Sequence, residues 1–228
     1  MELLLLGSSR TAAGYLTDYL PEIAAFAGSL HRAAFVPFAA VTRSWDDYAA
    51  AVANATGFAL DLVRTPGDLA RAGLIIVGGG NTFRLLHECR ARGLLEPLRE
   101  KVKTRAKYLG WSAGANLACP TIKTTNDMPI VDPGGLEALG LVGFQINPHY
   151  TDAALPGHFG ETRNERLAEF ARANPGVPVI GLPEGDWLRV SGGLVELRGP
   201  HPAVWFEGEK SPAKVQPGKL PPFFGDSA

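Results

Sequence analysis

Short apolar runs alternate with segments of helical spacing along most of this 228-residue chain. Short apolar runs between turn residues are typical of buried strands, whereas apolar residues three and four positions apart indicate helices. We expect strands at residues 3–6, 33–38, 58–63, 74–77, 108–111, 144–146 and 177–182. We expect helices at residues 15–27, with Pro21 as an interruption or helix boundary, and at residues 45–53, 66–71, 82–89, 94–103 and 161–173, and a small-residue helix from residue 113. This alternation predicts an α/β fold with a mainly parallel sheet and helices on both of its faces.

The C-terminal part of the chain has a different pattern. Apolar segments at residues 187–190, 194–197 and 203–206 are separated by Gly and Pro turns, which predicts an antiparallel meander along one edge of the sheet. Six of the last thirty residues are prolines, which cannot donate to a strand ladder. We therefore expect one α/β domain over residues 1–208 and a proline-rich C-terminal tail over residues 209–228.

Composition and charge exclude several classes of partner. Lys and Arg (22) nearly balance Asp and Glu (23), so we expect no sequence-independent grip on nucleic acid or on an anionic membrane. The two cysteines are too few for a disulfide framework and lack a metal-binding spacing. The opening MELLLLG has an acidic residue and only four consecutive leucines, which indicates a strand rather than a signal peptide. No apolar run approaches the roughly 20 residues of a membrane span, and we expect a cytoplasmic protein.

The segment from Gly110 to Gly114 has the pattern Gly-x-Ser-x-Gly, directly after an expected strand and before a run of helix formers. A serine on such a sharp turn holds its hydroxyl out of the sheet, and the flanking glycines relieve the crowding. The N-terminal amides of the following helix favour negative charge that develops beside the serine. The pattern predicts that Ser112 is a nucleophile; the plainer alternative is that Ser112 only caps the helix.

A serine nucleophile needs a base. His149 ends the stretch QINPH, just after an expected strand. Sites in open α/β sheets gather beyond the carboxyl ends of strands, where Ser112 also lies. His149 is therefore the first choice, and His158, in a glycine-flanked turn, is the second. The alternative for either is an ordinary surface or core histidine.

Two acids compete to orient the imidazole. Glu184 lies just after an expected strand, and strand-end placement favours it. Asp127, in the stretch TTNDMP, is favoured by the chain order Ser, Asp, His of α/β-hydrolases. Either carboxylate could instead bind local backbone amides in a turn.

A run of three glycines, from Gly78 to Gly80, follows a strand and opens a helix at Asn81. Glycines allow close backbone approach and leave amides free to face a ligand. The run lacks the G-x-G-x-x-G spacing and the Walker lysine, so a loop that binds an oxyanion is favoured over a nucleotide site. The alternative is a plain turn with Asn81 as the helix N-cap.

Taken together, six stretches of the chain resemble the peptidase E (α-aspartyl dipeptidase) family of serine peptidases. They occur in the order of the family within residues 3–206: GGGNT, GWSAGAN, TTNDMPI, QINPH, GETR and LPEG. Gly-x-Ser-x-Gly alone is unspecific, whereas the combined set is highly specific. The resemblance implies a flavodoxin-like fold similar to class I glutamine amidotransferases, with serine in place of the cysteine nucleophile.

The resemblance also implies roles for single residues. Ser112 would be the nucleophile and His149 the base, with Glu184 ranked slightly ahead of Asp127 as the partner of His149. The oxyanion donors would be backbone amides of Gly79 or Gly80 and of Ala113. The reaction implied is hydrolysis of Asp-Xaa dipeptides with a free N-terminal aspartate, without a metal or cofactor.

Substrate binding is expected to depend on an arginine. A carboxylate is best held by a planar guanidinium that donates two parallel hydrogen bonds. Arg163, in the stretch GETR, matches the family residue expected to do this, and Asn81 and Thr82 are further substrate-binding candidates.

Two other functions are kept as alternatives. One is a cyanophycinase-like hydrolase of another aspartyl peptide, which uses a serine on the same fold. The other is an inactive amidotransferase-like binding module, against which the presence of Ser112, His149 and both acids argues. A homodimer is left open.

Overall fold

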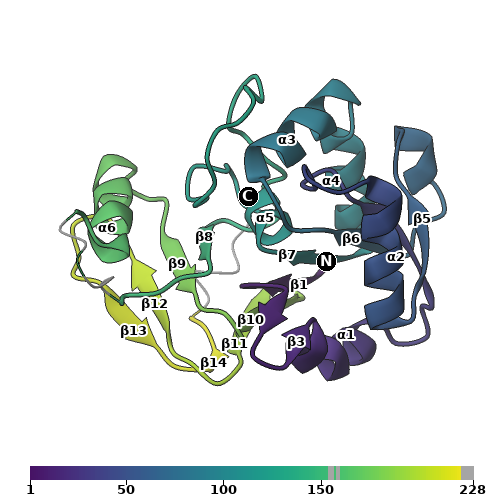
Figure 1. Ribbon diagram of the computed structural model, residues 1–228. Helices are drawn as coiled ribbons and strands as arrows, with labels where there is room; N and C mark the ends of the chain where they lie inside the picture. Colours follow the sequence, from purple (N-terminus) through teal and green to yellow (C-terminus); the bar gives the residue numbers. More distant parts are fainter. Residues whose placement is uncertain (154–156, 158–159, 222–228) are drawn as a thin grey trace.

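The computed structural model describes residues 1–153, 157 and 160–221 of the chain. A larger sheet contains eight strands, and a smaller sheet lies beside it (Figure 1). The strands of the larger sheet are β1 (Glu2–Leu6), β4 (Arg32–Val36), β5 (Ala59–Leu62), β6 (Leu74–Val77), β7 (Lys107–Trp111), β10 (Trp187–Ser191), β11 (Leu194–Arg198) and β14 (Gly218–Lys219). Their order across the sheet is β14-β11-β10-β1-β7-β6-β4-β5.

The larger sheet is parallel on one side of β1 and antiparallel on the other. β1, β7, β6, β4 and β5 pair in parallel, and β10, β11 and β14 continue the sheet in antiparallel order. Parallel neighbours need crossover connections, which the helices supply. The expected α/β fold, with a mainly parallel sheet and an antiparallel extension, is confirmed.

Helices cover both faces of the larger sheet. They are α1 (Leu20–Ala27), α2 (Trp45–Thr56), α3 (Thr82–Ala91), α4 (Leu95–Thr104) and α5 (Ala113–Leu117), with short 3-10 turns η1 (Thr17–Tyr19) and η2 (Pro66–Leu69), whereas α6 (Arg163–Ala173) packs on the smaller sheet. Because side chains alternate along a strand, Leu4 and Leu6 of β1 pack with α1 and α2, whereas Leu3 and Leu5 pack with α3, α4 and α5. Among the described residues, no helix is long and apolar enough to cross a membrane.

The first helix is shorter than the sequence predicts. The expected helix over residues 15–27 is replaced by a two-stranded ribbon, β2 (Arg10–Thr11) with β3 (Gly14–Tyr15), followed by η1 and α1. Pro21 has no N–H and is tolerated only in the first turn of a helix, so α1 begins at Leu20.

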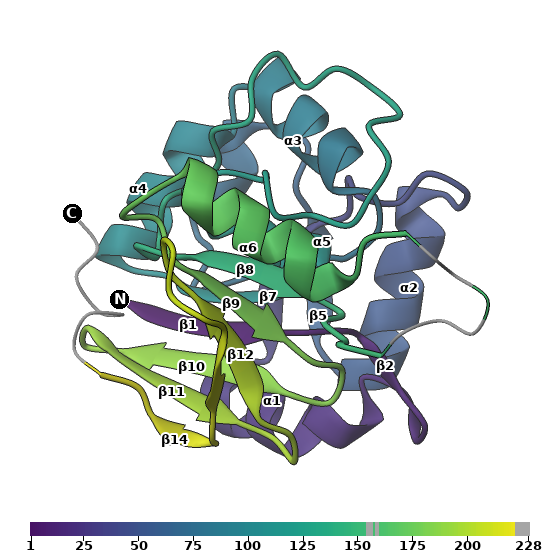
Figure 2. The same ribbon diagram turned by 90° about the vertical axis from the view of Figure 1, so that its left-hand side faces the viewer.

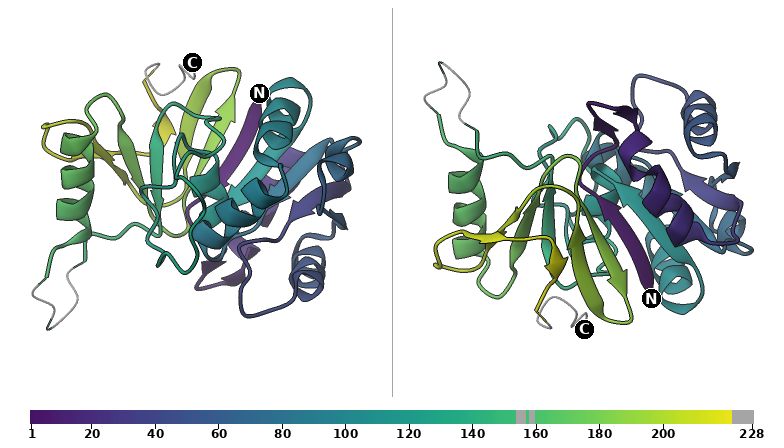
Figure 3. Two further views of the ribbon diagram at one scale, coloured as in Figure 1. Left: turned by 90° about the horizontal axis from the view of Figure 1, so that it is seen from above. Right: turned by 90° about the horizontal axis from the view of Figure 1, so that it is seen from below.

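The smaller sheet contains β8 (Gln145–Pro148), β9 (Val179–Leu182), β12 (Ala203–Phe206) and β13 (Ala213–Val215), in the order β13-β12-β9-β8. Helix α6 packs on it and lies, in both panels of Figure 3, on the opposite side of the molecule from α2. The expectation that residues 203–206 continue the meander of the larger sheet is therefore wrong. Pro200 and Pro202 cannot donate to a ladder, and the chain leaves β11 there and pairs with β9 instead.

Two short strands lie within residues 209–221. β13 pairs with β12, and β14 pairs with β11 at the edge of the larger sheet (Figure 2). The division of the chain at residue 208 into a domain and a tail stays a prediction.

Replacement of Leu5 by Ala should destabilise the fold strongly. Leu5 is fully buried in β1, the strand at which the parallel and antiparallel halves meet. Loss of a buried leucine side chain costs about 2–5 kcal/mol of unfolding free energy, which urea denaturation measures. Leu194→Ala on β11, where the side chain is 58% exposed, should cost no more than about 0.5 kcal/mol. Equal effects of the two changes would contradict the assignment of β1 to the core.

Candidate active site

Ser112 lies on the tight turn between β7 and α5. Its φ is 53°, in the left-handed region that side chains rarely adopt, and its N–H donates to the carbonyl of Leu6 at the end of β1 (3.1 Å). The glycines around it are sterically required. A Cβ on Gly114 would overlap the carbonyl of Val77, and a Cβ on Gly110 would lie 2.6 Å from the carbonyl oxygen of Gly114.

His149 and Glu184 meet Ser112 from the smaller sheet. His149 follows β8, and its Nε2 lies 2.9 Å from Ser112 Oγ. Its Nδ1 lies 2.6 Å from Oε1 of Glu184, which follows β9. A carboxylate at Nδ1 favours the proton on that nitrogen and leaves Nε2 free to accept from the serine hydroxyl. His158, the second candidate for the base, lies outside the described residues.

Backbone hydrogen bonds at the end of β1 connect the segments that carry these three side chains. Besides the Leu6 carbonyl that accepts from Ser112, the Gly7 carbonyl accepts from the N–H of His149 (3.1 Å). The Gly7 N–H donates to the carbonyl of Asp186, two residues after Glu184 (2.9 Å). A Cβ on Gly7 would overlap the carbonyl oxygen of Pro183 and lie 3.0 Å from that of Leu182, so only glycine allows this approach.

Asp127 is engaged at the start of α3 rather than on the imidazole. Its Oδ2 accepts from Thr82 N (2.7 Å), Thr82 Oγ1 (2.6 Å) and Thr125 Oγ1 (3.1 Å). These bonds satisfy a free amide of the helix terminus and tie it to the segment around Asp127. Of the two acids between which the sequence left the choice open, the geometry therefore places Glu184 on His149.

Asn81 is the N-cap of α3. Its Oδ1 accepts from Arg84 N (3.0 Å), and its Nδ2 donates to the carbonyl of Met128 (2.9 Å). The side chains of Asn81 and Thr82 thus both fix the position of the Asp127 segment against the helix. Their contact with a substrate stays a prediction.

The glycine run lies against Ser112. A Cβ on Gly79 would be 3.1 Å from Ser112 Cβ, and Gly80 has a φ of 137°. Tyr48 braces this loop, since its hydroxyl donates to the carbonyl of Gly79 (3.0 Å). Within the described part of the chain, the amides of Gly79, Gly80 and Ala113 have no hydrogen-bond acceptor.

Arg163 is the first residue of α6 and is half-buried. Its Nη1 donates to Asn147 Oδ1 (3.2 Å), and Asn147 Nδ2 donates to Asn126 Oδ1 (2.7 Å). Burial, and then the nearby Arg166, lower the pKa of Arg163, as expected for a cation without a paired acid. Arg163 therefore lies behind Asn147, and the hydrogen bond from Asn147 to Asn126, which lines the cavity described below, connects it to the site.

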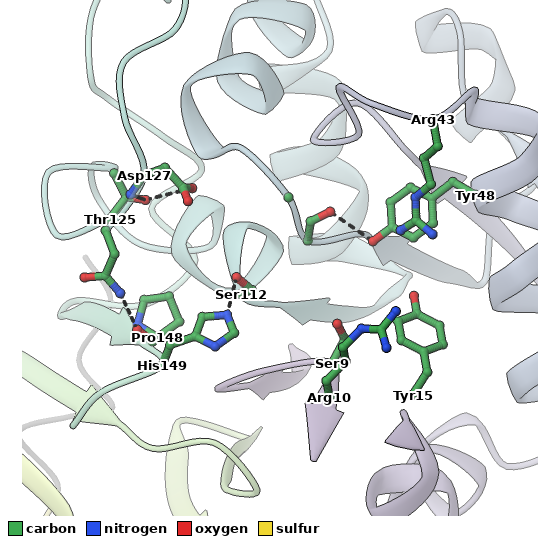
Figure 4. A pocket seen from close by; sticks show the side chains of 13 residues that line it. Ser9, Arg10, Tyr15, Arg43, Tyr48, Ser112, Thr125, Asp127, Pro148 and His149 are labelled. Carbon is green, nitrogen blue, oxygen red and sulfur yellow. Dashed lines mark hydrogen bonds between the residues drawn. The ribbon is translucent and has the colours of Figure 1, made fainter. Parts of the chain in front are cut away.

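A cavity of about 440 Å³ opens beside Ser112 (Figure 4). It is lined by Ser9, Arg10, Tyr15, Arg43, Tyr48, Gly79, Gly80, Ser112, Thr125, Asn126, Asp127, Pro148 and His149. Four of these residues belong to no motif that the sequence displays: Arg10, Tyr15, Arg43 and Tyr48. Arg10 and Arg43 lie beyond the carboxyl ends of β1 and β4, and that position is the signal that could have found them.

The described ranges contain no group of three or more His, Cys, Asp or Glu residues arranged to hold a metal ion. Cys89 and Cys119 are buried. Burial raises the pKa of Cys119 to about 12 and that of Cys89 further still, so neither forms a thiolate readily.

Replacement of Gly7 by Ala should damage both the fold and the site. The added methyl group would overlap the backbone around Leu182 and Pro183, and forced repacking costs about 1–3 kcal/mol. Urea denaturation and labelling of Ser112 by a fluorophosphonate measure the two effects. Gly67→Ala is the control, because its Cβ would meet only Thr65 Oγ1 at 3.6 Å. Normal stability and labelling in Gly7→Ala would show that the end of β1 does not position the site.

The chain is similar to known proteins along most of its length. A model of the family described as Peptidase family S51 matches residues 3–198. A protein named Peptidase E from Escherichia coli O6:K15:H31 is 48% identical over 226 residues, covering 96% of this chain and 99% of the relative. A Peptidase E from Citrobacter koseri is 49% identical over the same shares.

Solved structures show the same fold at lower identity. A putative peptidase E protein from Listeria monocytogenes EGD-e has a TM-score of 0.68 at 22% identity, over 87% of this chain and 98% of that one. A peptidase from an acI-B1 Actinobacterium has a TM-score of 0.61 at 18% identity, over 94% and 93%. The extent of the family match and the identity to relatives along nearly the whole chain show that this protein belongs to peptidase family S51.

Proposed function

We propose that this protein is a serine dipeptidase that hydrolyses Asp-Xaa dipeptides with a free N-terminal aspartate, through an acyl-enzyme intermediate. As a member of peptidase family S51, it is a serine-type peptidase and acts on peptides. The observation that carries the proposed mechanism is the hydrogen-bonded series from Glu184 through His149 to Ser112, beside a cavity large enough for a small peptide.

The proposed reaction begins with proton transfer from Ser112 to His149. Nε2 of His149 accepts the hydroxyl proton while Ser112 Oγ attacks the aspartyl carbonyl carbon. Glu184 holds Nδ1–H and stabilises the imidazolium that forms. His149 then protonates the leaving amine, and water, activated in the same way, releases aspartate and restores the serine.

The oxyanion of the tetrahedral intermediate would be held by backbone amides. The unpartnered N–H groups of Gly79 or Gly80 and of Ala113 flank Ser112. Amides fixed in place before the reaction stabilise developing charge without reorganisation. Tyr48 contributes indirectly, because its bond to the Gly79 carbonyl holds the loop.

Selection of aspartate would depend on two charged side chains, the cation Arg163 and the anion Asp127. Arg163 would bind the substrate's side-chain carboxylate, and the carboxylate of Asp127, which lines the cavity, would bind the free ammonium. A neutral side chain would leave the half-buried Arg163 without an anion, which is costly. The relatives named Peptidase E and the GETR stretch support this substrate class.

Substitutions should separate the roles of the two acids. We expect Ser112→Ala and His149→Ala to lower kcat on the order of 10⁴-fold or more. Glu184→Gln should lower kcat by less than the loss of about 10⁴-fold found for a buried triad acid, because its side chain is 59% exposed and solvent weakens its interaction with the imidazolium. Asp127→Ala should lower the unfolding free energy by about 0.5–2 kcal/mol, because the bonds that Asp127 accepts from Thr82 at the start of α3 are lost.

Steady-state kinetics on Asp-Leu and urea denaturation measure these effects. Fluorophosphonate labelling of Ser112 that persists in His149→Ala would contradict the assigned base. Activity that survives Glu184→Gln but is destroyed by Asp127→Asn at normal stability would reverse the assignment of the orienting acid.

Arg163→Gln should abolish the preference for aspartate. We expect the ratio of kcat/KM for Asp-Leu over Asn-Leu to fall about tenfold to a hundredfold, since a hydrogen-bonded charge pair is lost. Arg166→Gln is the matched control on the same helix, because that side chain is 62% exposed and pairs with Glu161. A panel extended by β-Asp-Leu and N-acetyl-Asp-Leu tests the cyanophycinase-like alternative. An unchanged Asp/Asn ratio in Arg163→Gln would contradict the proposed carboxylate site.

A further inference from the structure

The cavity wall across Ser112 from His149 carries side chains that the proposed mechanism does not use. Arg10 and Tyr15 face each other across the ribbon of β2 and β3, and Arg43 lies just before α2. Figure 4 shows these three side chains on one side of Ser112 and His149 on the other. The cavity therefore has a cationic end opposite the proposed base.

Both guanidinium groups at this end lie against aromatic rings rather than acids. Arg43 Cζ is 3.5 Å from the centroid of the Tyr48 ring, and Arg10 Cζ is 5.7 Å from that of Tyr15. Such contacts orient a guanidinium while its N–H edge stays available. Over the residues that the structure describes, neither arginine pairs with a carboxylate, whereas an exposed arginine such as Arg32 does.

The Tyr15 hydroxyl is a third unused group. Its oxygen is buried and, as far as the chain is described, makes no hydrogen bond of good geometry, although Tyr48 and Arg43 lie close enough to interact with it. In Figure 4 it points toward Arg43 and Tyr48. Burial, and then the neighbouring Tyr48, raise the pKa of Tyr15, so the phenol keeps its proton and can donate. A buried hydroxyl without a well-formed hydrogen bond needs an explanation, and an oxygen of a bound ligand that accepts from it would supply one.

We propose that Arg10, Arg43 and Tyr15 form a subsite for the terminal carboxylate of the leaving residue. In a dipeptide this carboxylate lies a single residue beyond the scissile bond, so it falls close to Ser112. Guanidinium groups bind carboxylates through parallel N–H···O bonds. The inference rests on the proposed dipeptidase function: the aspartyl residue occupies the Arg163 side and the leaving residue the Arg10 side.

This subsite would select substrates by length. A longer peptide places a neutral amide where a dipeptide has its terminal carboxylate. The two cations would then lack an anion, and binding of the leaving part would weaken. The site would thus have two carboxylate subsites with separate tasks, one for residue type and one for the end of the chain.

The test compares three substrates that differ in one charge each. Asp-Leu carries both carboxylates, Asp-Leu-amide lacks the terminal one, and Asn-Leu lacks the side-chain one. Values of kcat/KM are measured for the wild-type protein, Arg10→Gln/Arg43→Gln, Tyr15→Phe and Arg163→Gln. Arg71→Gln, at an exposed arginine that does not line the cavity, is the control.

We expect the wild type to prefer Asp-Leu over Asp-Leu-amide by about tenfold to a hundredfold. In the Arg10→Gln/Arg43→Gln variant this ratio should approach one, mainly through a higher KM for Asp-Leu. Tyr15→Phe should reduce the ratio several-fold. The preference for Asp-Leu over Asn-Leu should fall in Arg163→Gln and persist in the double variant.

Other outcomes would overturn the inference. Equal losses on Asp-Leu and Asp-Leu-amide in the double variant would show that the arginines do not bind the terminal carboxylate. Loss of the Asp/Asn preference there would show that they bind the aspartyl side chain instead. Hydrolysis of neither Asp-Leu nor its amide by the wild type would overturn the proposed function itself, and this subsite with it.

Discussion

Three backbone hydrogen bonds at the end of β1 hold the site together. Leu6 accepts from the N–H of Ser112, Gly7 accepts from the N–H of His149, and Gly7 donates to the carbonyl of Asp186, two residues after Glu184. The side chains that meet at the site come from two sheets that share no strand. Catalytic geometry has to be held to a fraction of an ångström, and main-chain bonds to one central strand provide that precision where flexible side-chain contacts would not.

The parallel half of the larger sheet could be predicted because its signals are local. Each strand is a short apolar run, and helices begin at caps that the sequence displays, such as Ser44 before α2. The partner of β12 could not be predicted in this way. Pro200 and Pro202 indicate that hydrogen bonding between strands is interrupted after β11. The pairing of β12 with β9, in contrast, depends on contacts between segments far apart in the chain.

The residues of the site that come directly after strands could be predicted from the sequence. Ser112 and His149 have strand-end positions within recognisable motifs, and the structure brings them together. Glu184 and Asp127 have equivalent sequence contexts, and only the three-dimensional arrangement separates them. The cationic end of the cavity, which includes Arg10 of β2, matches no motif, because a side chain in a short connecting segment needs only to reach the cavity. The position of such a residue leaves no periodic pattern in the sequence.

The split of the site between two sheets has a consequence for inactivation. His149, Glu184 and Arg163 follow or begin elements of the smaller sheet and its helix. This sheet has a small apolar cluster of its own beneath α6, whereas Ile146, Ile180, Leu182 and Ala203 pack in the core that it shares with the larger sheet. Proteins open in cooperative units of unequal stability. Separation of the two sheets would disperse the site, and it would at the same time expose part of their common core. Heat resistance of the activity would therefore depend on the apolar contacts that join the two sheets.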